Sequence, residues 1–225
     1  MIWKTDNNLT YAAVVPAAGL SSRMGAFKPL LDLNGKPLIC RTLDSLWAGG
    51  AETICVVTGH RAEELEAAAA APDVRFVRNP DYAQNGMLES VQIGLKALFG
   101  KGRQTAAEHP FDFVFILPGD IPLVSPETMQ ALTSAAEGGA DLSGRGTAAV
   151  VRPSFQGRAG HPVLLSSVMA EDLLQYKGPD GLRGFLKGHL AETVFVETDD
   201  PAILADADTP EDYQKVLELK KKRGF

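Results

Sequence analysis

The chain has 225 residues, of which 45% are hydrophobic, so it is long and apolar enough to bury a full core as one α/β domain. Its formal net charge of -6, from 22 Lys and Arg against 28 Asp and Glu, argues against nucleic acid or an anionic membrane as a general partner. Its two cysteines, Cys40 and Cys55, stand in apolar contexts, as expected for reduced thiols of a cytoplasmic protein. No apolar run approaches the roughly 18 residues of a membrane span. Residues 1–10 are polar and predict an N-terminal extension without a signal peptide, followed by a single domain over 11–225.

Short apolar runs alternate with amphipathic segments along the chain. The predicted strands are 11–18, 53–58, 74–77, 111–117, 147–152, 162–165, 193–197 and a short one at 202–205. The predicted helices are 37–48, 61–71, 86–99, 126–137, 166–175, 181–187 and 210–222. This order predicts an α/β fold with a mostly parallel central sheet and helices on both faces. Loops are predicted at 101–109 and 138–146, and between 147 and 190 the pattern leaves parallel and antiparallel pairing open.

A small-residue loop with two cations follows the first predicted strand, in PAAGLSSRMGAFKPLL (16–31). In a parallel sheet the chemistry gathers at the carboxyl ends of the strands, which is where this loop lies. Its backbone N–H groups suit an anion, and Arg23 and Lys28 would add full charges, so the pattern indicates a triphosphate cradle. It matches neither GxxxxGK[ST] nor GxGxxG, which points away from ordinary ATPases and dehydrogenases. The alternative is a tight turn whose glycines supply positive φ and whose cations are solvated.

Carboxylates follow two later apolar segments. FVFILPGDIP (113–122) ends with Asp120 at the mouth of the predicted sheet, where a lone carboxylate suits Mg²⁺ and its water and phosphate ligands. The alternative makes Asp120 a turn residue or a helix cap. Asp206 and Asp208 follow the short strand predicted at 202–205, just before a helix that Thr209 would cap. Only one of these two aspartates is expected to face a metal ion.

Several motifs stand in the order typical of one enzyme family. Besides PAAGLSSRMGAFKPLL, PGDIP and DADTPEDY, they are NPDYAQNGMLESVQIGL (79–95), GRAGHPVLL (157–165) and GPDGLRGFL (178–186). Together they resemble the MobA-like NTP transferase family, and the last two resemble its molybdenum cofactor cytidylyltransferase branch. Ala18 before Gly19 favours the cytidylyl type, since guanylyl relatives usually place a second glycine there. Pro16 departs from the usual leucine, which matters little if only its backbone meets the nucleotide.

The resemblance implies a Rossmann-like three-layer nucleotidyltransferase fold and transfer of CMP from CTP to molybdopterin, a phosphorylated pterin, with release of pyrophosphate. Cytidylyl, guanylyl or uridylyl transfer to another phosphorylated acceptor, such as a sugar phosphate, is one alternative. Another is a non-catalytic cofactor-binding chaperone for a molybdenum hydroxylase. In-line attack by an acceptor phosphate needs no protein nucleophile, and the chain accordingly contains no GxSxG, HExxH or CxxC motif.

The resemblance also implies residue roles. Lys28 would neutralise the α-phosphate and Arg23 the leaving pyrophosphate, while Asp120 and one of Asp206 or Asp208 would hold Mg²⁺. The implied nucleotide-binding set is Ala17, Ala18, Gly19, Ser21, Arg23, Gly25, Lys28, Asn79, Gly86, Met87, Ser90 and Gly119. His161 and Arg183 are candidates for binding the acceptor. For His161 the alternative is a structural turn, and for Arg183 it is a solvated helix cation.

Overall fold

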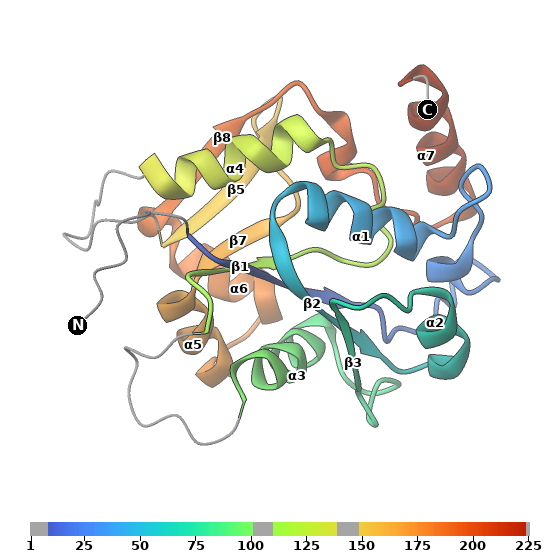
Figure 1. Ribbon diagram of the computed structural model, residues 1–225, viewed down its shortest axis with the longest axis horizontal. Helices are drawn as coiled ribbons and strands as arrows, with labels where there is room; N and C mark the ends of the chain where they lie inside the picture. Colours follow the sequence, from blue (N-terminus) through green and yellow to red (C-terminus); the bar gives the residue numbers. More distant parts are fainter. Residues whose placement is uncertain (1–8, 101–109, 139–148, 224–225) are drawn as a thin grey trace.

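A mixed eight-stranded sheet forms the centre of the computed structural model, which describes residues 9–100, 110–138 and 149–223 (Figure 1). The strand order is β3-β2-β1-β4-β7-β5-β6, and β8 pairs with β5. The strands are β1 (Tyr11–Pro16), β2 (Ala51–Thr58), β3 (Val74–Arg78), β4 (Phe113–Ile116), β5 (Val150–Phe155), β6 (Arg158–Ala159), β7 (Val163–Ser166) and β8 (Thr193–Glu197). The helices are α1 (Leu38–Ala48), α2 (Ala62–Ala68), α3 (Met87–Phe99), α4 (Pro126–Gly138), α5 (Ser167–Gln175), α6 (Gly181–Gly188) and α7 (Pro210–Lys222).

The predicted parallel sheet is confirmed in its core. β1 pairs in parallel with β2 and β4, and β2 pairs in parallel with β3. β7 runs antiparallel to both β4 and β5, while β5 and β8 pair in parallel. Antiparallel pairing therefore enters in the region where the sequence left the direction open. The loop predicted at 101–109, and the one predicted at 138–146 beyond its first residue, lie outside the described residues.

Two details of the second half differ from the sequence prediction. The strand predicted at 202–205 is wrong, because Pro201–Leu204 forms a 3-10 turn. The Asp200 carboxylate accepts the Ala202 N–H at 2.9 Å, and this local cap competes with an extended backbone. The short strand β6 was not predicted. It forms a hairpin with β5 through Gln156 and Gly157, whose φ values of 50° and 73° suit a two-residue type I′ turn.

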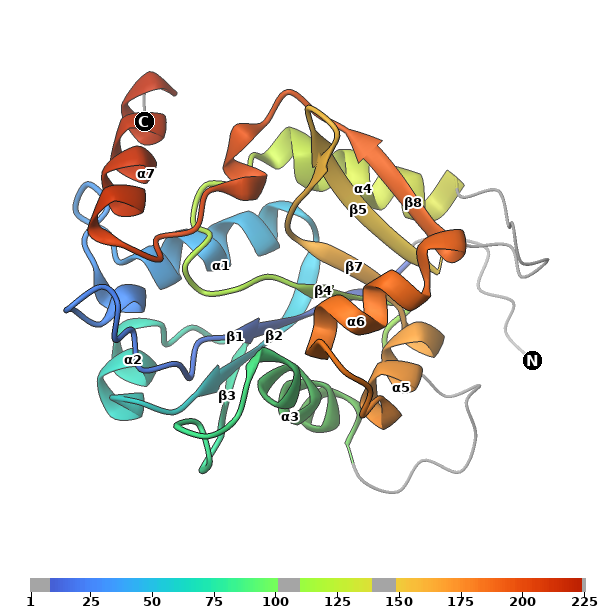
Figure 2. The same ribbon diagram turned by 180° about the vertical axis from the view of Figure 1, so that it is seen from behind.

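Helices cover both faces of the sheet (Figures 1 and 2). One apolar cluster joins β1 and β4 to α1, α2 and α4, and the other joins the same strands to α3, α5 and α6. Alternate residues of β1 enter the two clusters, because side chains along a strand point to opposite faces. Helix α3 approaches the sheet closely at Gly94, where a Cβ atom would lie 2.5 Å from Val14 Cγ1. The continuous apolar runs of the sequence thus reflect a sheet buried on both sides.

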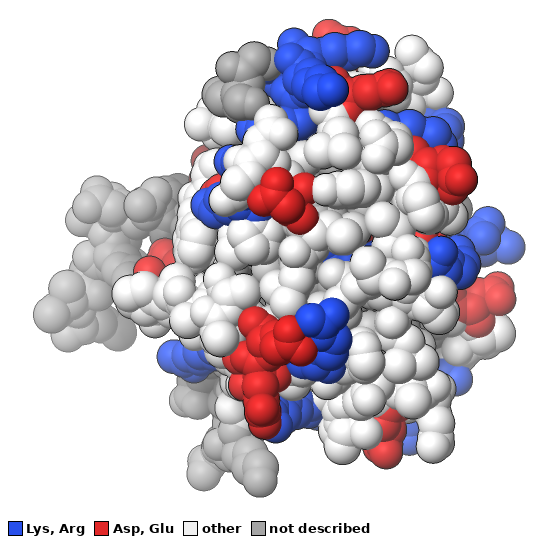
Figure 3. Space-filling model, turned by 90° about the vertical axis from the view of Figure 1, so that its right-hand side faces the viewer, with Lys and Arg blue, Asp and Glu red and all other residues white. Residues whose placement is uncertain are grey.

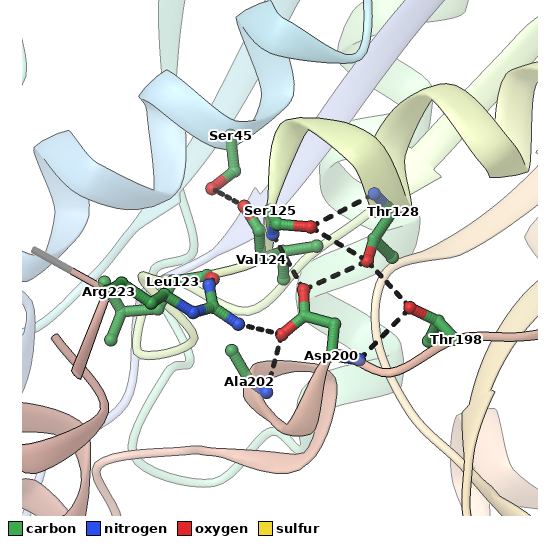
Figure 4. Close-up of polar contacts among 9 residues, drawn as sticks. All are labelled: Ser45, Leu123, Val124, Ser125, Thr128, Thr198, Asp200, Ala202 and Arg223. Carbon is green, nitrogen blue, oxygen red and sulfur yellow. Dashed lines mark hydrogen bonds and ion pairs between the residues drawn. The ribbon is translucent and has the colours of Figure 1, made fainter.

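The C-terminal helix closes one end of the molecule. Val216 of α7 packs with Leu33 and Leu38 in a third apolar cluster. Just beyond α7, Arg223 pairs with the buried Asp200 carboxylate, which also accepts the Ser125 N–H at 2.8 Å (Figure 4). This network anchors the segment that leads from residue 200 into the candidate site.

Charges on the face seen in Figure 3 are mixed. Lys and Arg side chains gather at the α7 end, whose last turn is basic, and both signs are interspersed elsewhere among uncharged surface. Cations at a helix C-terminus stabilise it through the helix dipole. No helix in the described part of the chain is long and apolar enough to cross a membrane.

Candidate active site

A pocket of about 260 Å³ opens where β1 and β4 end at the carboxyl edge of the sheet. Segments distant in sequence meet there, as expected for an open α/β sheet. The lining residues are Pro16, Ala17, Ala18, Gly19, Ser21, Lys28, Pro29, Tyr82, Asn85, Gly86, Met87, Ser90, Pro118, Gly119, Asp120 and Asp208. The structure therefore brings together the motif after β1, the motif after β4, the start of α3 and the acidic segment before α7.

The loop after β1 presents backbone donors to this pocket. The N–H groups of Gly19, Leu20 and Ser22 donate to no acceptor within the described residues. Ser21 takes a positive φ of 56°, which is uncommon for a residue with a side chain. Its hydroxyl accepts the Lys28 N–H at 3.2 Å and so ties the two ends of the loop together. A loop held in this way, with free N–H groups, is suited to binding an anion.

A cluster of alternating charges lies beside the loop. Lys28 Nζ lies 3.3 Å from Asp120 Oδ2 and also contacts Asp208 Oδ1. Arg23 Nη2 lies 2.7 Å from Asp208 Oδ2, so Arg23 borders the pocket without lining it. The Lys28 side chain is only 12% exposed, whereas that of Arg23 is 72% exposed. Burial raises the pKa of Asp120, and the Lys28 ammonium opposes that rise.

The two aspartates before α7 differ in position. Asp208 lines the pocket, whereas Asp206 is exposed and does not. Partial desolvation of Asp206, followed by the charges of Asp208 and Asp120, raises its pKa. Between them, buried Ala207 donates its N–H to the Asp120 carbonyl at 3.2 Å, which fixes the segment against the turn that follows β4.

The carboxylates at this edge of the sheet fit Mg²⁺ better than they fit a metal ion that takes most of its ligands from the protein. Among the described residues no group of three His, Cys, Asp or Glu side chains converges on a metal position. Asp120 and Asp208 do converge, since both contact the Lys28 ammonium. Mg²⁺ is commonly bound by one or two carboxylates together with waters and substrate phosphates. These two carboxylates therefore suit Mg²⁺ bound together with a nucleotide.

Asn79 lies behind the pocket wall and is not among the lining residues. It is 1% exposed, and its Nδ2 donates to Ser90 Oγ at 3.1 Å. Its Oδ1 accepts the Asp81 N–H at 3.1 Å and the Asn85 side-chain N–H at 3.2 Å. Asn79 thus positions the turn that brings Tyr82 and Asn85 to the pocket.

Tyr82 and Asn85 were missed as lining residues, although both lie in the quoted segment NPDYAQNGMLESVQIGL. Their place depends on a close packing contact that the sequence does not reveal. A Cβ atom at Gly59 would lie 2.7 Å from the Ala18 carbonyl oxygen and 2.7 Å from the Tyr82 side chain. Gly25, also predicted in the nucleotide set, has a φ of 69° and lies in the loop outside the lining.

His161 and Arg183 meet in a second cavity of about 470 Å³, which shares Met87 with the first. The cavity is lined by Met87, Arg152, His161, Leu182, Arg183, Leu186, Lys187 and Leu190. Burial, and then the charge of Arg152, lowers the pKa of His161 to about 4. His161 is therefore neutral at physiological pH. Arg152 and Lys187 were not singled out from the sequence, because one lies within a strand and the other resembles a solvated helix cation.

Comparison with known proteins agrees with this architecture. The chain is 30% identical, over 201 residues, to the molybdenum cofactor cytidylyltransferase of Escherichia coli (strain K12), covering 89% of this chain and 92% of that protein. A nucleotidyl transferase from Methanothermobacter thermautotroptrophicus superimposes with a TM-score of 0.76 at 27% identity, over 96% of this chain and 99% of that one. CMP:2-keto-3-deoxy-manno-octonic acid synthetase, solved in complex with CTP, shares the fold with a TM-score of 0.65 at 17% identity, over 95% and 99% of the two chains.

The family assignment rests on most of the chain. The model of the MobA-like NTP transferase domain matches residues 13–194. This span contains the loop after β1, Asp120, and the helices α3 and α6 that line the two cavities. The three-layer nucleotidyltransferase fold expected from the sequence is the fold observed. The chain belongs to the MobA-like NTP transferase family and is a nucleotidyltransferase.

Proposed function

We propose that the protein transfers CMP from CTP to molybdopterin and releases pyrophosphate. The observation that carries the proposal is the convergence of Lys28, Asp120 and Asp208 beside a loop with free N–H groups. Such a site would neutralise the charge of a triphosphate, and direct transfer between phosphates needs no protein nucleophile. The choice of CTP and of a molybdenum cofactor acceptor is supported by the name of the E. coli relative and by Ala18 before Gly19.

The residues can act by position and charge. A phosphate oxygen of the acceptor attacks the α-phosphorus of CTP, a new P–O bond forms, and the bond to the β-phosphate oxygen breaks as pyrophosphate leaves. Lys28 would neutralise the charge that grows at the α-phosphate. Arg23 and the N–H groups of the 19–22 loop would hold the β- and γ-phosphates and stabilise the leaving pyrophosphate.

Asp120 and Asp208 would hold Mg²⁺, for which their convergence on one ammonium group is the supporting geometry. When bound, Mg²⁺ neutralises phosphate charge and orients the triphosphate. Binding of a cation to the two carboxylates would also release Lys28 from them, leaving the ammonium free to meet a phosphate. Lys28 and the metal are thus expected to act together.

The base and ribose would occupy the other end of the pocket. Ala17 and Ala18 leave room beside the sheet edge, while Gly86 and Met87 present the start of α3 to the nucleotide. The free N–H groups at a helix start suit an electronegative atom of the ligand. The dinucleotide product would serve a molybdenum hydroxylase in the cytoplasm, a location that fits the free thiols of Cys40 and Cys55.

The test is pyrophosphate release in the presence of Mg²⁺ with CTP, GTP, ATP and UTP in parallel, each with and without molybdopterin. Release with CTP that requires molybdopterin is the expected result. Equal release with GTP would contradict the choice of nucleotide. Release that requires a sugar phosphate instead of molybdopterin would contradict the choice of acceptor.

A further inference from the structure

A buried amide holds the turn that leads into α3. The N–H of buried Asn79 donates to the Thr58 carbonyl at 2.8 Å, which anchors Asn79 to the end of β2. Its side-chain oxygen accepts the Asp81 N–H at 3.1 Å and the side-chain N–H of Asn85 at 3.2 Å. The backbone N–H of Asn85 donates to the Asp81 carbonyl at 2.9 Å. Both the backbone and the side chain of Asn85 are therefore fixed where this residue lines the nucleotide pocket.

These hydrogen bonds assign the orientation of both side-chain amides. A backbone N–H can only donate, so the atom of Asn79 that meets the Asp81 N–H is its carbonyl oxygen. The amide nitrogen of Asn79 then donates to Ser90 Oγ at 3.1 Å. Asn85 must present its own nitrogen to the Asn79 oxygen, because turning its amide over would set two acceptors against each other. The carbonyl oxygen is thereby left as the free end of the Asn85 side chain.

The free oxygen of Asn85 is an unused acceptor that solvent can reach. Among the described residues no donor meets it. Asn85 is half-buried, and its oxygen is not one of the fully buried atoms that lack a partner, so this atom keeps accessible surface. Asn85 lines the pocket together with Gly86 and Met87, at the end where the proposed function places the base. An amide oxygen carries lone pairs and no hydrogen, so it can pair only with a donor on the ligand.

We propose that Asn85 Oδ1 accepts a hydrogen bond from the exocyclic amine of cytosine and so selects CTP over UTP. Cytosine carries an amino group at C4, which donates, whereas uracil carries a carbonyl oxygen there, which only accepts. UTP would therefore place one acceptor against another and leave the Asn85 oxygen unpaired. Adenine also carries an amine, so this role of Asn85 concerns the choice between the two pyrimidines.

Asn79 is a positioning residue in this scheme. Its oxygen keeps the Asn85 amide from turning over, and its own orientation is fixed by a backbone group that no change of side-chain protonation can reverse. The inference rests on the proposed function, because that function places a cytosine base in this pocket. It adds to it the residue that distinguishes the base.

Calorimetric titration of nucleotides, with Mg²⁺ and without an acceptor, tests the inference. The unmodified protein should bind UTP at least about tenfold more weakly than CTP, because UTP leaves a polar group unpaired. The triphosphate of pyrimidin-2-one riboside, which lacks the amine, should also bind about tenfold more weakly or worse. N85A should weaken CTP binding by a similar factor without weakening UTP binding. Q84A is the matched control, since exposed Gln84 lies in the same turn outside the pocket lining, and it should keep the preference for CTP.

N79A tests the positioning role, because it releases the Asn85 amide. Without the Asn79 oxygen, Asn85 can turn its nitrogen toward the C4 oxygen of uracil. The ratio of CTP affinity to UTP affinity should therefore fall toward one while UTP binding is kept. A purely structural role for Asn79 would instead weaken the binding of both nucleotides by the same factor, which would overturn this part of the inference.

The comparison of nucleotides needs no variant, so it holds if a substitution disturbs folding. Equal binding of CTP and UTP, equal binding of CTP and the amine-free analogue, or no binding of CTP would overturn the inference, as would an unchanged preference for CTP in N85A. A preference for CTP that depends on Asn85, without nucleotide transfer to molybdopterin, would leave the inference standing and contradict the proposed function. Transfer of CMP to molybdopterin with a preference for CTP that N85A retains would do the reverse.

Discussion

Lys28 and Asp208 are 180 residues apart in the chain, yet their side chains form an ion pair at the edge of the sheet. The pair is largely withdrawn from solvent on the lysine side, and Asp120 reaches the same ammonium group. Contact between the loop after β1, the end of β4 and the segment before α7 thus creates the charge cluster. Changing any one of these three segments should therefore alter the geometry of the charge cluster.

Replacing Lys28 by alanine should lower the transfer rate by about 10²–10⁴-fold, because charge at the α-phosphate loses its nearest cation. Steady-state pyrophosphate release, with circular dichroism to check folding, measures the effect. K36A is the control, since Lys36 pairs with Asp44 at 2.6 Å on the surface, outside both cavities. A rate for K28A equal to that for K36A would exclude the role given to Lys28.

Asp208 and Asp206 should respond differently to neutralisation. D208N is expected to raise the Mg²⁺ concentration needed for half-maximal activity by about tenfold or more, since it removes one of the two converging carboxylates. D206N, which changes an exposed side chain outside the pocket, should shift it by less than about threefold. Activity is measured as a function of Mg²⁺ concentration for both variants. A larger shift in D206N than in D208N would indicate that Asp206, and not Asp208, binds the metal ion.

Gly59 should tolerate no side chain. In G59A the new Cβ would meet the Ala18 carbonyl oxygen and the Tyr82 side chain, each at 2.7 Å, so the pocket wall must shift. We expect a loss of about 1–3 kcal/mol in unfolding free energy and weaker nucleotide binding. G188A is the matched control, because nothing lies within 4 Å of the atom it adds. Chemical denaturation and nucleotide titration of the two variants test this; unchanged binding in G59A would be inconsistent with the wall described.

The sequence predicted the pocket better than it predicted the second cavity. The ends of β1 and β4 could be located because buried parallel strands read as continuous apolar runs, and ligands bind where such strands end. Arg152 could not be identified in this way, because it lies within a strand and becomes a lining residue of the second cavity only in the folded chain. The strand predicted at 202–205 was wrong for a local reason, because the Asp200 cap and Pro201 favour a 3-10 turn over a strand.

The stability of the protein should depend on the protonation of His161. Its pKa of about 4 in the folded state lies below the ordinary value of 6.5, so the unfolded chain binds a proton first as the pH falls. The contribution of the neutral ring to stability is present above pH about 6.5 and is lost as the pH falls toward 4, by at most about 3 kcal/mol. Denaturation of the unmodified protein and H161F should show their difference changing in this window. A constant difference would mean that His161 titrates normally.

We propose that this charge cluster transfers a cytidylyl group to a phosphorylated pterin. The most direct measurement is mass spectrometry of the products after incubation with CTP, Mg²⁺ and molybdopterin, with pyrophosphate measured in the same sample. We expect a pterin carrying one added CMP to form in a one-to-one ratio with pyrophosphate, and K28A to form almost none. Pyrophosphate or CMP released without any cytidylylated pterin would contradict it.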